Sequence, residues 1–302
     1  MKKVRGFFAI LWPAVVAVMV PVYIGVASVF VLFQSIFGAY MLVTPPGERT
    51  FIGMMDLLGY AGETLLVYTL ELTDVYTALM PISWILIFFF WYREMLRKEK
   101  IYQGGDNTGS QELKIKLFTP GNLFFLALIA LGCQIVIGGG MELIQPYFER
   151  IMEEYNELIQ QFMNGNAVVV FVTTVILAPF SEELLFRGVI MKKAQKIAPA
   201  FVAILIQAIL FALFHMNIVQ SLYTLPAGLI LGYVAYKFKS IKASIVLHMM
   251  FNALSYVMIM PESTVAFIGY MVFGVIVLVL GLRWVARIGA TGYGRHNTVK
   301  EA

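Results

Sequence analysis

The chain has 302 residues, of which 60% are hydrophobic and only 13% are charged, and its formal net charge at pH 7 is +4. Soluble domains usually carry about 25% charged residues. Together with a mean hydropathy of +0.81, this composition excludes an ordinary soluble domain. The small net charge gives no indication of nucleic-acid binding, so the first partner that we expect is the lipid bilayer.

The first apolar run extends from 7 to 43, which is longer than the roughly 7 to 15 residues of a signal-peptide core. It follows a basic start at 2–5 and predicts an uncleaved first span, kinked at Pro13 and Pro21 because proline removes a helical hydrogen bond. Further runs of spanning length lie at 75–92, 121–141, 166–186, 198–215, 218–236, 243–260 and 264–284. Since a span needs about 20 residues, the sequence predicts an all-α, polytopic transmembrane helix bundle of about eight spans.

Basic residues gather at the N-terminus and in alternate connections between the apolar runs. The clusters are the N-terminus, 93–100 with Lys114 and Lys116, 192–196, 237–242 and 283–295. Because Lys and Arg are enriched in cytoplasmic loops, we expect both termini in the cytoplasm. The acidic stretch 142–157 then lies outside, where its pattern predicts an amphipathic interfacial helix, and we place 59–72 at the same outer surface.

The glycine-rich stretch 104–110 is the only linker-like segment of the sequence, and it predicts a cytoplasmic loop. We divide the chain into N-terminal membrane spans with this loop and the outer amphipathic helix (1–165), a core that carries the polar motifs (166–260), and a last span with a cytoplasmic tail (261–302). The single cysteine, Cys133, cannot form an internal disulfide and is predicted to pack as an apolar residue.

Charged side chains appear inside the apolar runs of the second half. Such a residue costs about 2.5 to 3.5 kcal/mol at the bilayer centre on insertion scales, which makes it a candidate for function. Glu183 and Arg187 are four positions apart and predict an ion pair on one helix face. Glu182 is rotated by about 100° and lacks this partner, as expected of a general base or acid. The alternative is that these charges cap a helix at the interface.

Two of the three histidines belong to apolar runs. His215 ends one run, one turn after Phe211, whereas His248 and Asn252 are four positions apart and share a helix face. His296 lies in the polar C-terminal tail and is predicted to be solvated. Taken singly, interfacial solvation or hydrogen bonding between helices accounts for each group, but their concentration in one region indicates a single site.

Three motifs in this order resemble those of the type II CAAX prenyl endopeptidase and bacteriocin-processing family of intramembrane peptidases. The motifs are EExxxR at Glu182, Glu183 and Arg187, FxxxH at Phe211 and His215, and HxxxN at His248 and Asn252. The resemblance covers about 165 to 260 and implies that 166–260 is a CAAX-protease-like catalytic core. We expect the protein to be integral to a prokaryotic plasma membrane.

The resemblance also implies roles for these residues. In the family, the first glutamate and the FxxxH histidine are held to activate water, which are Glu182 and His215 here. The last histidine and the asparagine, here His248 and Asn252, stabilise the oxyanion. Hydrolysis of an amide requires such a base and such donors, and a neutral imidazole with an asparagine amide would supply two donors. The supporting residues around these groups would be Glu183, Arg187 and Phe211.

A glutamate and two histidines also resemble the three-ligand set of catalytic zinc, and the ligands would then be Glu182, His215 and His248. The sequence has no HExxH helix, and a metal-free glutamate mechanism accounts for the same residues. We therefore expect no required cofactor, with zinc as the alternative.

The predicted function is an intramembrane endopeptidase, of glutamate type or a metalloendopeptidase, that cuts a peptide or a lipidated protein such as a prenylated CAAX substrate. One alternative is a non-proteolytic binding or immunity-type member of the same fold. A second is a proton-coupled transporter that uses the same polar residues as a relay. A transporter predicts two related halves with interrupted helices, and the sequence shows no such repeat.

Overall fold

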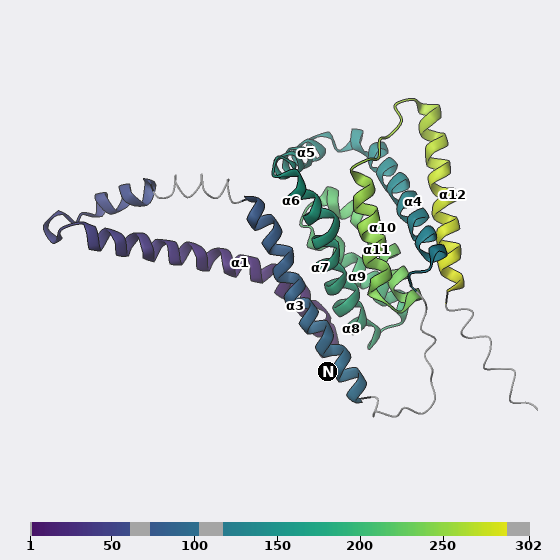
Figure 1. Cartoon of the computed structure of the whole chain (residues 1–302), viewed down its shortest axis with the longest axis horizontal. Coiled ribbons are helices and arrows are strands. Elements are labelled where there is room, and N and C mark those ends of the chain that lie inside the picture. The colour runs from purple at the N-terminus through teal and green to yellow at the C-terminus, as the bar shows by residue number, and fades with distance from the viewer. Residues whose placement is uncertain (1, 61–72, 103–116, 289–302) are drawn as a thin grey trace, which may run out of the picture.

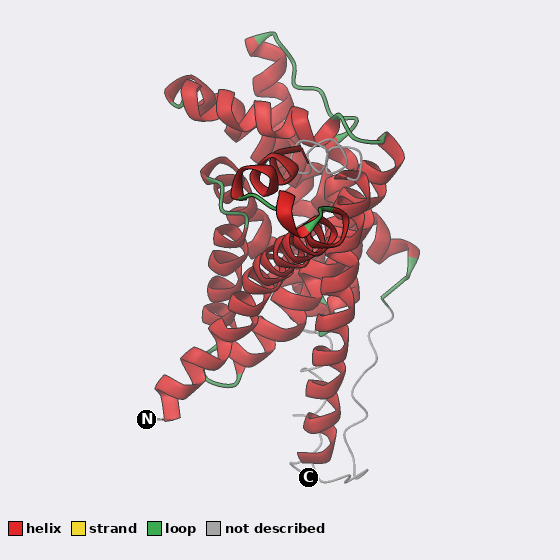
Figure 2. Ribbon diagram, turned by 90° about the vertical axis from the view of Figure 1, so that its left-hand side faces the viewer, coloured by secondary structure: helices red, strands yellow, loops and turns green. Residues whose placement is uncertain are grey.

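The structure is a computed structural model that describes residues 2–60, 73–102 and 117–288. These residues form helices and connecting loops without a strand (Figure 2), which confirms the all-α prediction. Residues 61–72 of the predicted outer segment, the predicted loop 104–110 and His296 lie outside the described residues.

The helices follow one another in four groups. The N-terminal group is α1 (Lys2–Val43), η1 (Pro46–Glu48), a helix at Phe51–Tyr60 and α3 (Thr73–Tyr102), and the next is α4 (Pro120–Ile144), η2 (Gln145–Tyr147) and α5 (Glu149–Met163). A continuous helical stretch consists of α6 (Ala167–Val172), η3 (Thr173–Leu177), α7 (Ala178–Glu183), η4 (Leu184–Met191) and α8 (Lys192–Gln195). The last group is α9 (Ala200–Phe214), α10 (Ile218–Phe238), α11 (Ile241–Ser255) and α12 (Thr264–Arg287). The prolines predicted to kink the first span do not break α1, which is a single helix.

Within the described residues, 5 helices are long and apolar enough to cross a membrane, namely Thr77–Glu99, Pro120–Tyr147, Ala167–Gln195, Ile218–Phe238 and Thr264–Arg287. Two of the predicted spans, 198–215 and 243–260, correspond instead to the shorter helices α9 and α11, of 15 residues each. At 1.5 Å per residue, each is about 22 Å long, whereas the hydrocarbon core is about 30 Å thick. A straight helix of this length is too short to cross that core, and both helices carry residues of the predicted site.

Close packing of α4 against α12 relies on glycines. The two helices lie side by side in Figure 1. A Cβ atom added to Gly132 of α4 would lie 2.6 Å from Cβ and 2.7 Å from the backbone N of Leu278, and one added to Gly274 of α12 would clash with Ile135. Small residues at such contacts let two membrane helices approach closely, and this pair supports the bundle on the side away from α1 and α3.

The helices α9 and α10 form a hairpin that turns at 215–217. Met216 adopts a left-handed backbone conformation with φ of 50°, and the side chain of Asn217 accepts a hydrogen bond from the backbone N–H of Gln220 at the start of α10. Gly228 and Gly232 of α10 face α9, because a Cβ atom at either position would press on α9 side chains. The hairpin therefore holds the end of α9 close against α10.

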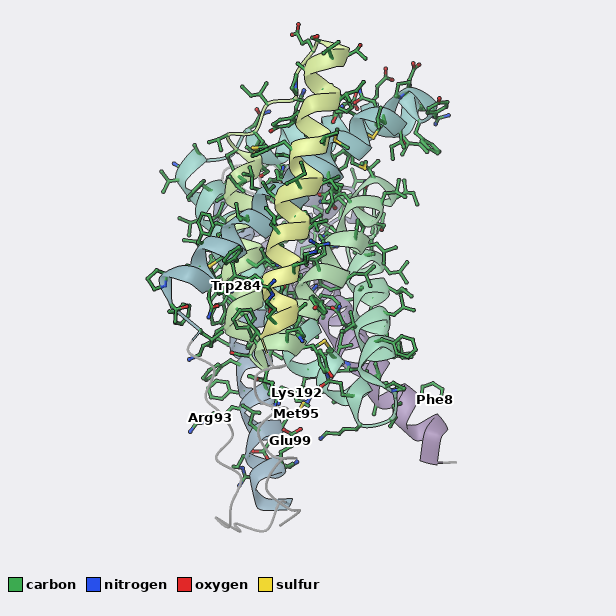
Figure 3. The ribbon with its side chains drawn as sticks, turned by 90° about the vertical axis from the view of Figure 1, so that its right-hand side faces the viewer. Phe8, Arg93, Met95, Glu99, Lys192 and Trp284 are labelled. Carbon is green, nitrogen blue, oxygen red and sulfur yellow. The ribbon has the colours of Figure 1, made fainter. Side chains whose placement is uncertain are left out.

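Basic residues tie α8 to the first helices at one end of the bundle. Lys192 and Lys196 lie 3.4 and 3.2 Å from the carboxylate of Glu99 on α3, as Figure 3 shows for Lys192 and Glu99 near that end. Lys193 donates a hydrogen bond to the carbonyl oxygen of Ala9 on α1 over 3.0 Å. The start of α1, the end of α12 and α8 all lie at this end (Figure 1), in agreement with basic clusters on one side.

The predicted amphipathic helix is present as α5, at the opposite end of the bundle from α8 (Figure 1). It begins at Glu149 rather than at 142, because the residues before it complete α4 and form η2. Its acidic side chains are exposed, and the hydroxyl of Tyr155 lies 3.2 Å from that of Tyr223 on α10. This contact attaches α5 to the hairpin.

Candidate active site

Both glutamates of the first motif lie on a membrane helix with two π-helical stretches. The short helix α7 carries Glu182 and Glu183, and it is preceded by η3 and followed by η4, both of which are π-helical. The whole stretch Ala167–Gln195 is long and apolar enough to span a membrane. π-Helical turns are rare in proteins, and those that occur are often at functional sites. The local geometry therefore indicates a functional segment independently of its charges.

The predicted ion pair between Glu183 and Arg187 is present. Nη1 of Arg187 lies 2.7 Å from Oε1 of Glu183, and both side chains are 0% exposed. Desolvating two charges is costly unless further hydrogen bonds satisfy them. The other hydrogen-bond partners of Glu183 and Arg187 are therefore needed to stabilise this buried pair.

Arg187 finds its other partners on α9 and α10. Its Nη2 atom donates to the carbonyl oxygen of Gly228 over 3.2 Å, and its guanidinium carbon lies 4.6 Å from the ring centroid of Phe211, a cation–π arrangement. The buried Gln207 donates to the same Gly228 oxygen over 2.8 Å. Sequence reasoning missed Gln207, although its spacing of four from Phe211 and eight from His215 along an apolar helix is a signal that it shares their face.

His248 lies between the two glutamates. Its Nδ1 atom is 3.0 Å from Oε1 of Glu183, and its Nε2 atom is 3.7 Å from Oε2 of Glu182. Glu183 is ionised by its pairing with Arg187 and can only accept, so Nδ1 of His248 carries a hydrogen. A neutral ring in this tautomer carries an acceptor lone pair, and no hydrogen, on Nε2.

In the described part of the chain no arginine forms an ion pair with Glu182, and His248 is its neighbour. The side chain of Glu182 is 14% exposed, against 0% for Glu183. It is the more accessible of the two carboxylates, and water can reach it more readily than Glu183.

His215 is placed at the end of α9 by the turn of the hairpin. Its Nδ1 atom lies 2.8 Å from the carbonyl oxygen of Phe211. A carbonyl only accepts, so Nδ1 donates, and a neutral ring then has an acceptor lone pair on Nε2. The ring of Phe211 contacts those of both histidines, with centroid distances of 5.0 Å to His215 and 5.8 Å to His248, which brings the FxxxH and HxxxN motifs together.

Asn252 faces the same stretch of helix as His248. Its Nδ2 atom donates to the backbone carbonyl oxygen of Thr174 in η3 over 2.8 Å. His248, one turn earlier on α11, contacts Glu183, which follows Thr174 by nine positions. The amide therefore has one hydrogen engaged and a second that is available to another acceptor. Thr174 is a further residue that the motifs do not contain.

The proposed zinc ligands do not form a ligand set in this geometry. Among the residues that the structure describes, no group of three His, Cys, Asp or Glu side chains is arranged to hold a metal ion. Nδ1 of His248 is directed to Glu183, so that Nε2 is the ring nitrogen that would face a metal.

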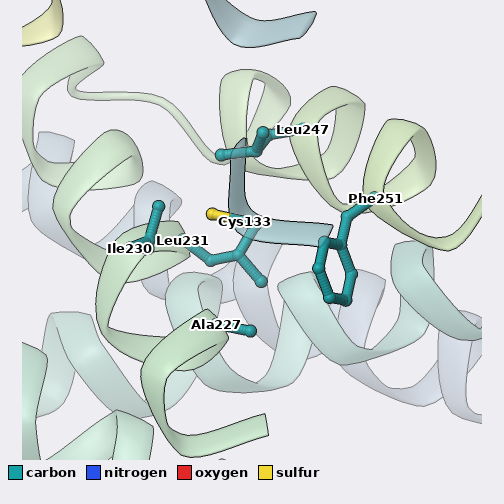
Figure 4. A pocket seen from close by; sticks show the side chains of 6 residues that line it. All are labelled: Cys133, Ala227, Ile230, Leu231, Leu247 and Phe251. Carbon is teal, nitrogen blue, oxygen red and sulfur yellow. The ribbon is translucent and has the colours of Figure 1, made fainter. Parts of the chain in front are cut away.

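An apolar pocket lies between α4, α10 and α11. It is lined by Cys133, Ala227, Ile230, Leu231, Leu247 and Phe251 (Figure 4). Cys133 is buried among these side chains, as predicted for a packing residue. The pocket contains no residue of the three motifs and is separate from the candidate site.

Comparison with protein families matches residues 164–254 to the family described as type II CAAX prenyl endopeptidase Rce1-like. The matched segment contains all three motifs and confirms the resemblance found in the sequence. Comparisons with curated proteins and with solved structures gave no significant match. Through residues 164–254, this integral membrane protein is thus similar to the type II CAAX prenyl endopeptidases, a family of proteases.

Proposed function

We propose that the protein is an intramembrane endopeptidase in which Glu182 activates water for attack on a peptide bond. The observation that carries this proposal is the meeting of Glu182, Glu183 and His248 inside an apolar bundle, with His248 supplied by a helix 65 positions away in the chain. Ionisable side chains are costly to place in a membrane, which makes this cluster a candidate for function. The family match extends over the same residues.

In the proposed reaction, Glu182 accepts a proton from water while the resulting hydroxide attacks the carbonyl carbon. His215 assists through Nε2, whose lone pair can accept a hydrogen bond from that water, since its Nδ1 atom donates to Phe211. When the tetrahedral intermediate collapses, Glu182 returns the proton to the leaving amine. Protons and electron pairs balance over these steps without a further reactant.

The oxyanion is stabilised by Asn252 and His248. Asn252 offers the Nδ2 hydrogen that Thr174 does not use. His248 can donate from Nε2 only as an imidazolium, because its Nδ1 hydrogen is engaged by Glu183. In that charged form it would bind an oxyanion more strongly than a neutral donor does.

The proposed substrate is a membrane-associated peptide, with a prenylated C-terminal CAAX-type peptide as the first candidate from the family match. The test is cleavage of fluorogenic peptides by the purified protein in detergent, with one prenylated peptide and one unmodified peptide of the same sequence. We expect Glu182→Gln to reduce kcat by about 10² to 10⁴-fold, the usual contribution of a general base.

A matched control is Glu157→Gln, which changes an exposed carboxylate of α5 and is expected to leave cleavage unchanged. Cleavage that survives Glu182→Gln would remove Glu182 from the proposed role. A folded wild-type protein that cuts neither peptide would favour a binding or immunity-type function instead.

A further inference from the structure

The backbone around Thr174 has an unusual hydrogen-bonding pattern. In a helix, a carbonyl oxygen accepts from the N–H four residues later in the α pattern or five residues later in the π pattern. For Thr174 these donors would be residues 178 and 179. The N–H of Ala178 instead bonds to the carbonyl of Thr173, and residue 179 is Pro179, which has no N–H.

The Thr174 carbonyl is therefore left without either helical donor. A buried carbonyl without a partner is costly in a membrane, and neighbouring helices commonly satisfy the groups that a proline frees. Here the donor is Nδ2 of Asn252, at 2.8 Å. Pro179 is itself buried, whereas Thr174 and Asn252 are partly buried.

A second contact holds α11 to the same residue. The hydroxyl of Thr174 lies 2.8 Å from the carbonyl of Val170 and 2.6 Å from the hydroxyl of Tyr256, at the end of α11. Because the carbonyl can only accept, Thr174 donates to it and Tyr256 donates to Thr174. Both contacts place the end of α11, and with it Asn252, against η3.

We propose that Pro179 is a positioning residue that keeps the Thr174 carbonyl free to orient the amide of Asn252. The catalytic consequence of this proposal rests on the proposed peptidase function. The proposal assigns a role to the π-helical stretch, which lies outside the three motifs. Replacing Pro179 by a residue with an N–H supplies a competing donor for Thr174, which releases Asn252 from its orientation.

The first test measures apparent melting temperatures in detergent for Pro179→Ala, Asn252→Ala and the double variant. In the wild-type background, Asn252→Ala removes the partner of a partly buried carbonyl and lowers the melting temperature. In the Pro179→Ala background the new N–H takes over that carbonyl, so Asn252→Ala is expected to cause a smaller decrease. Equal decreases in the two backgrounds would show that the two residues do not share this acceptor and would overturn the proposal.

The second test measures kcat and KM for the same variants. We expect Pro179→Ala to lower kcat by about tenfold or more with KM little changed, because a misdirected oxyanion donor weakens binding of the transition state. In the Asn252→Ala background the same substitution should have almost no further effect on kcat. Independent effects on kcat in the two backgrounds would remove the positioning role.

Pro81→Ala in α3 is the control, since it removes a proline from inside another apolar helix and is expected to leave kcat unchanged. The melting cycle does not depend on catalysis. If the wild-type protein cuts no peptide, the proposed function fails, while the melting temperatures still decide whether Pro179 keeps the Thr174 carbonyl available to Asn252.

Discussion

The ring nitrogen Nδ1 of His248 lies 3.0 Å from Oε1 of Glu183, the same oxygen that accepts from Arg187 over 2.7 Å. One carboxylate oxygen thus joins the ion pair of the EExxxR motif to the histidine of the HxxxN motif. Through Arg187 the connection continues to Gly228 on α10. Changes at Glu183 are therefore expected to affect the stability of the bundle and the orientation of His248 together.

Substitution of Glu183 by glutamine should strongly destabilise the protein. The variant leaves the buried guanidinium of Arg187 without its counter-charge, and breaking such a buried pair costs about 3 to 5 kcal/mol. Thermal unfolding in detergent measures this effect. Glu94→Gln, which breaks the exposed pair with Arg97, serves as the control and should change the melting temperature little. Equal changes for both variants would contradict a structural role for the buried pair.

Two glutamines with buried, unpaired Oε1 atoms are expected to respond differently to replacement by leucine. Gln207→Leu removes a donor that satisfies Gly228 and should destabilise the protein by about 1 kcal/mol, with a lower kcat because Arg187 loses its fixed position. Gln134→Leu removes an unpaired acceptor in α4, which carries none of the three motifs, and should leave kcat unchanged. A decrease in kcat for both variants would point to general disruption instead.

The packing of α4 against α12 can be tested by substituting two glycines of α4, Gly132 and Gly140. Gly132→Ala would bring Cβ within 2.7 Å of a backbone nitrogen of α12, which cannot move easily, whereas Gly140→Ala meets nothing within 4 Å. Overpacking typically costs about 1 to 3 kcal/mol, so only Gly132→Ala should lower the melting temperature. A tolerated Gly132→Ala would mean that the two helices are not so closely packed.

His215 should be required for catalysis more than for folding. Its ring is held by one hydrogen bond to Phe211 and is only partly buried, so His215→Gln should change the melting temperature little while kcat/KM falls by about 10² to 10⁴-fold, as for a lost general base. His296→Gln, outside the motifs, is the control. Full activity of His215→Gln would exclude the water-activating role.

Removal of divalent metal is expected to leave cleavage unchanged. The proposed steps use only protein groups, and the three candidate ligands do not form a metal-binding group in the described part of the chain. The measurement is kcat/KM before and after dialysis against a chelator. Activity that disappears and is restored by zinc would establish the metalloendopeptidase alternative.

Local features of the structure could be predicted from spacing and composition alone. A separation of four positions determines that Glu183 can reach Arg187 along one helix, and the apolar runs indicate membrane helices because lipid leaves backbone groups no other partner than their own helix. Motif order indicated the family over about 165 to 260, and the match at 164–254 confirms it. Helix lengths were predicted less well, since α9 and α11 are shorter than the apolar runs that contain them.

The meeting of the motifs was decided by tertiary structure. His248 reaches Glu183 only because α11 packs against α7, and Asn252 finds its acceptor only because a π-helical turn and a proline free one carbonyl. Residues such as Gln207 and Gly228 complete the site without belonging to any motif. Spacing along the chain reports which side chains share a face of one helix, whereas contacts between helices depend on how closely their backbones approach, and that distance is determined by side chains on both partners.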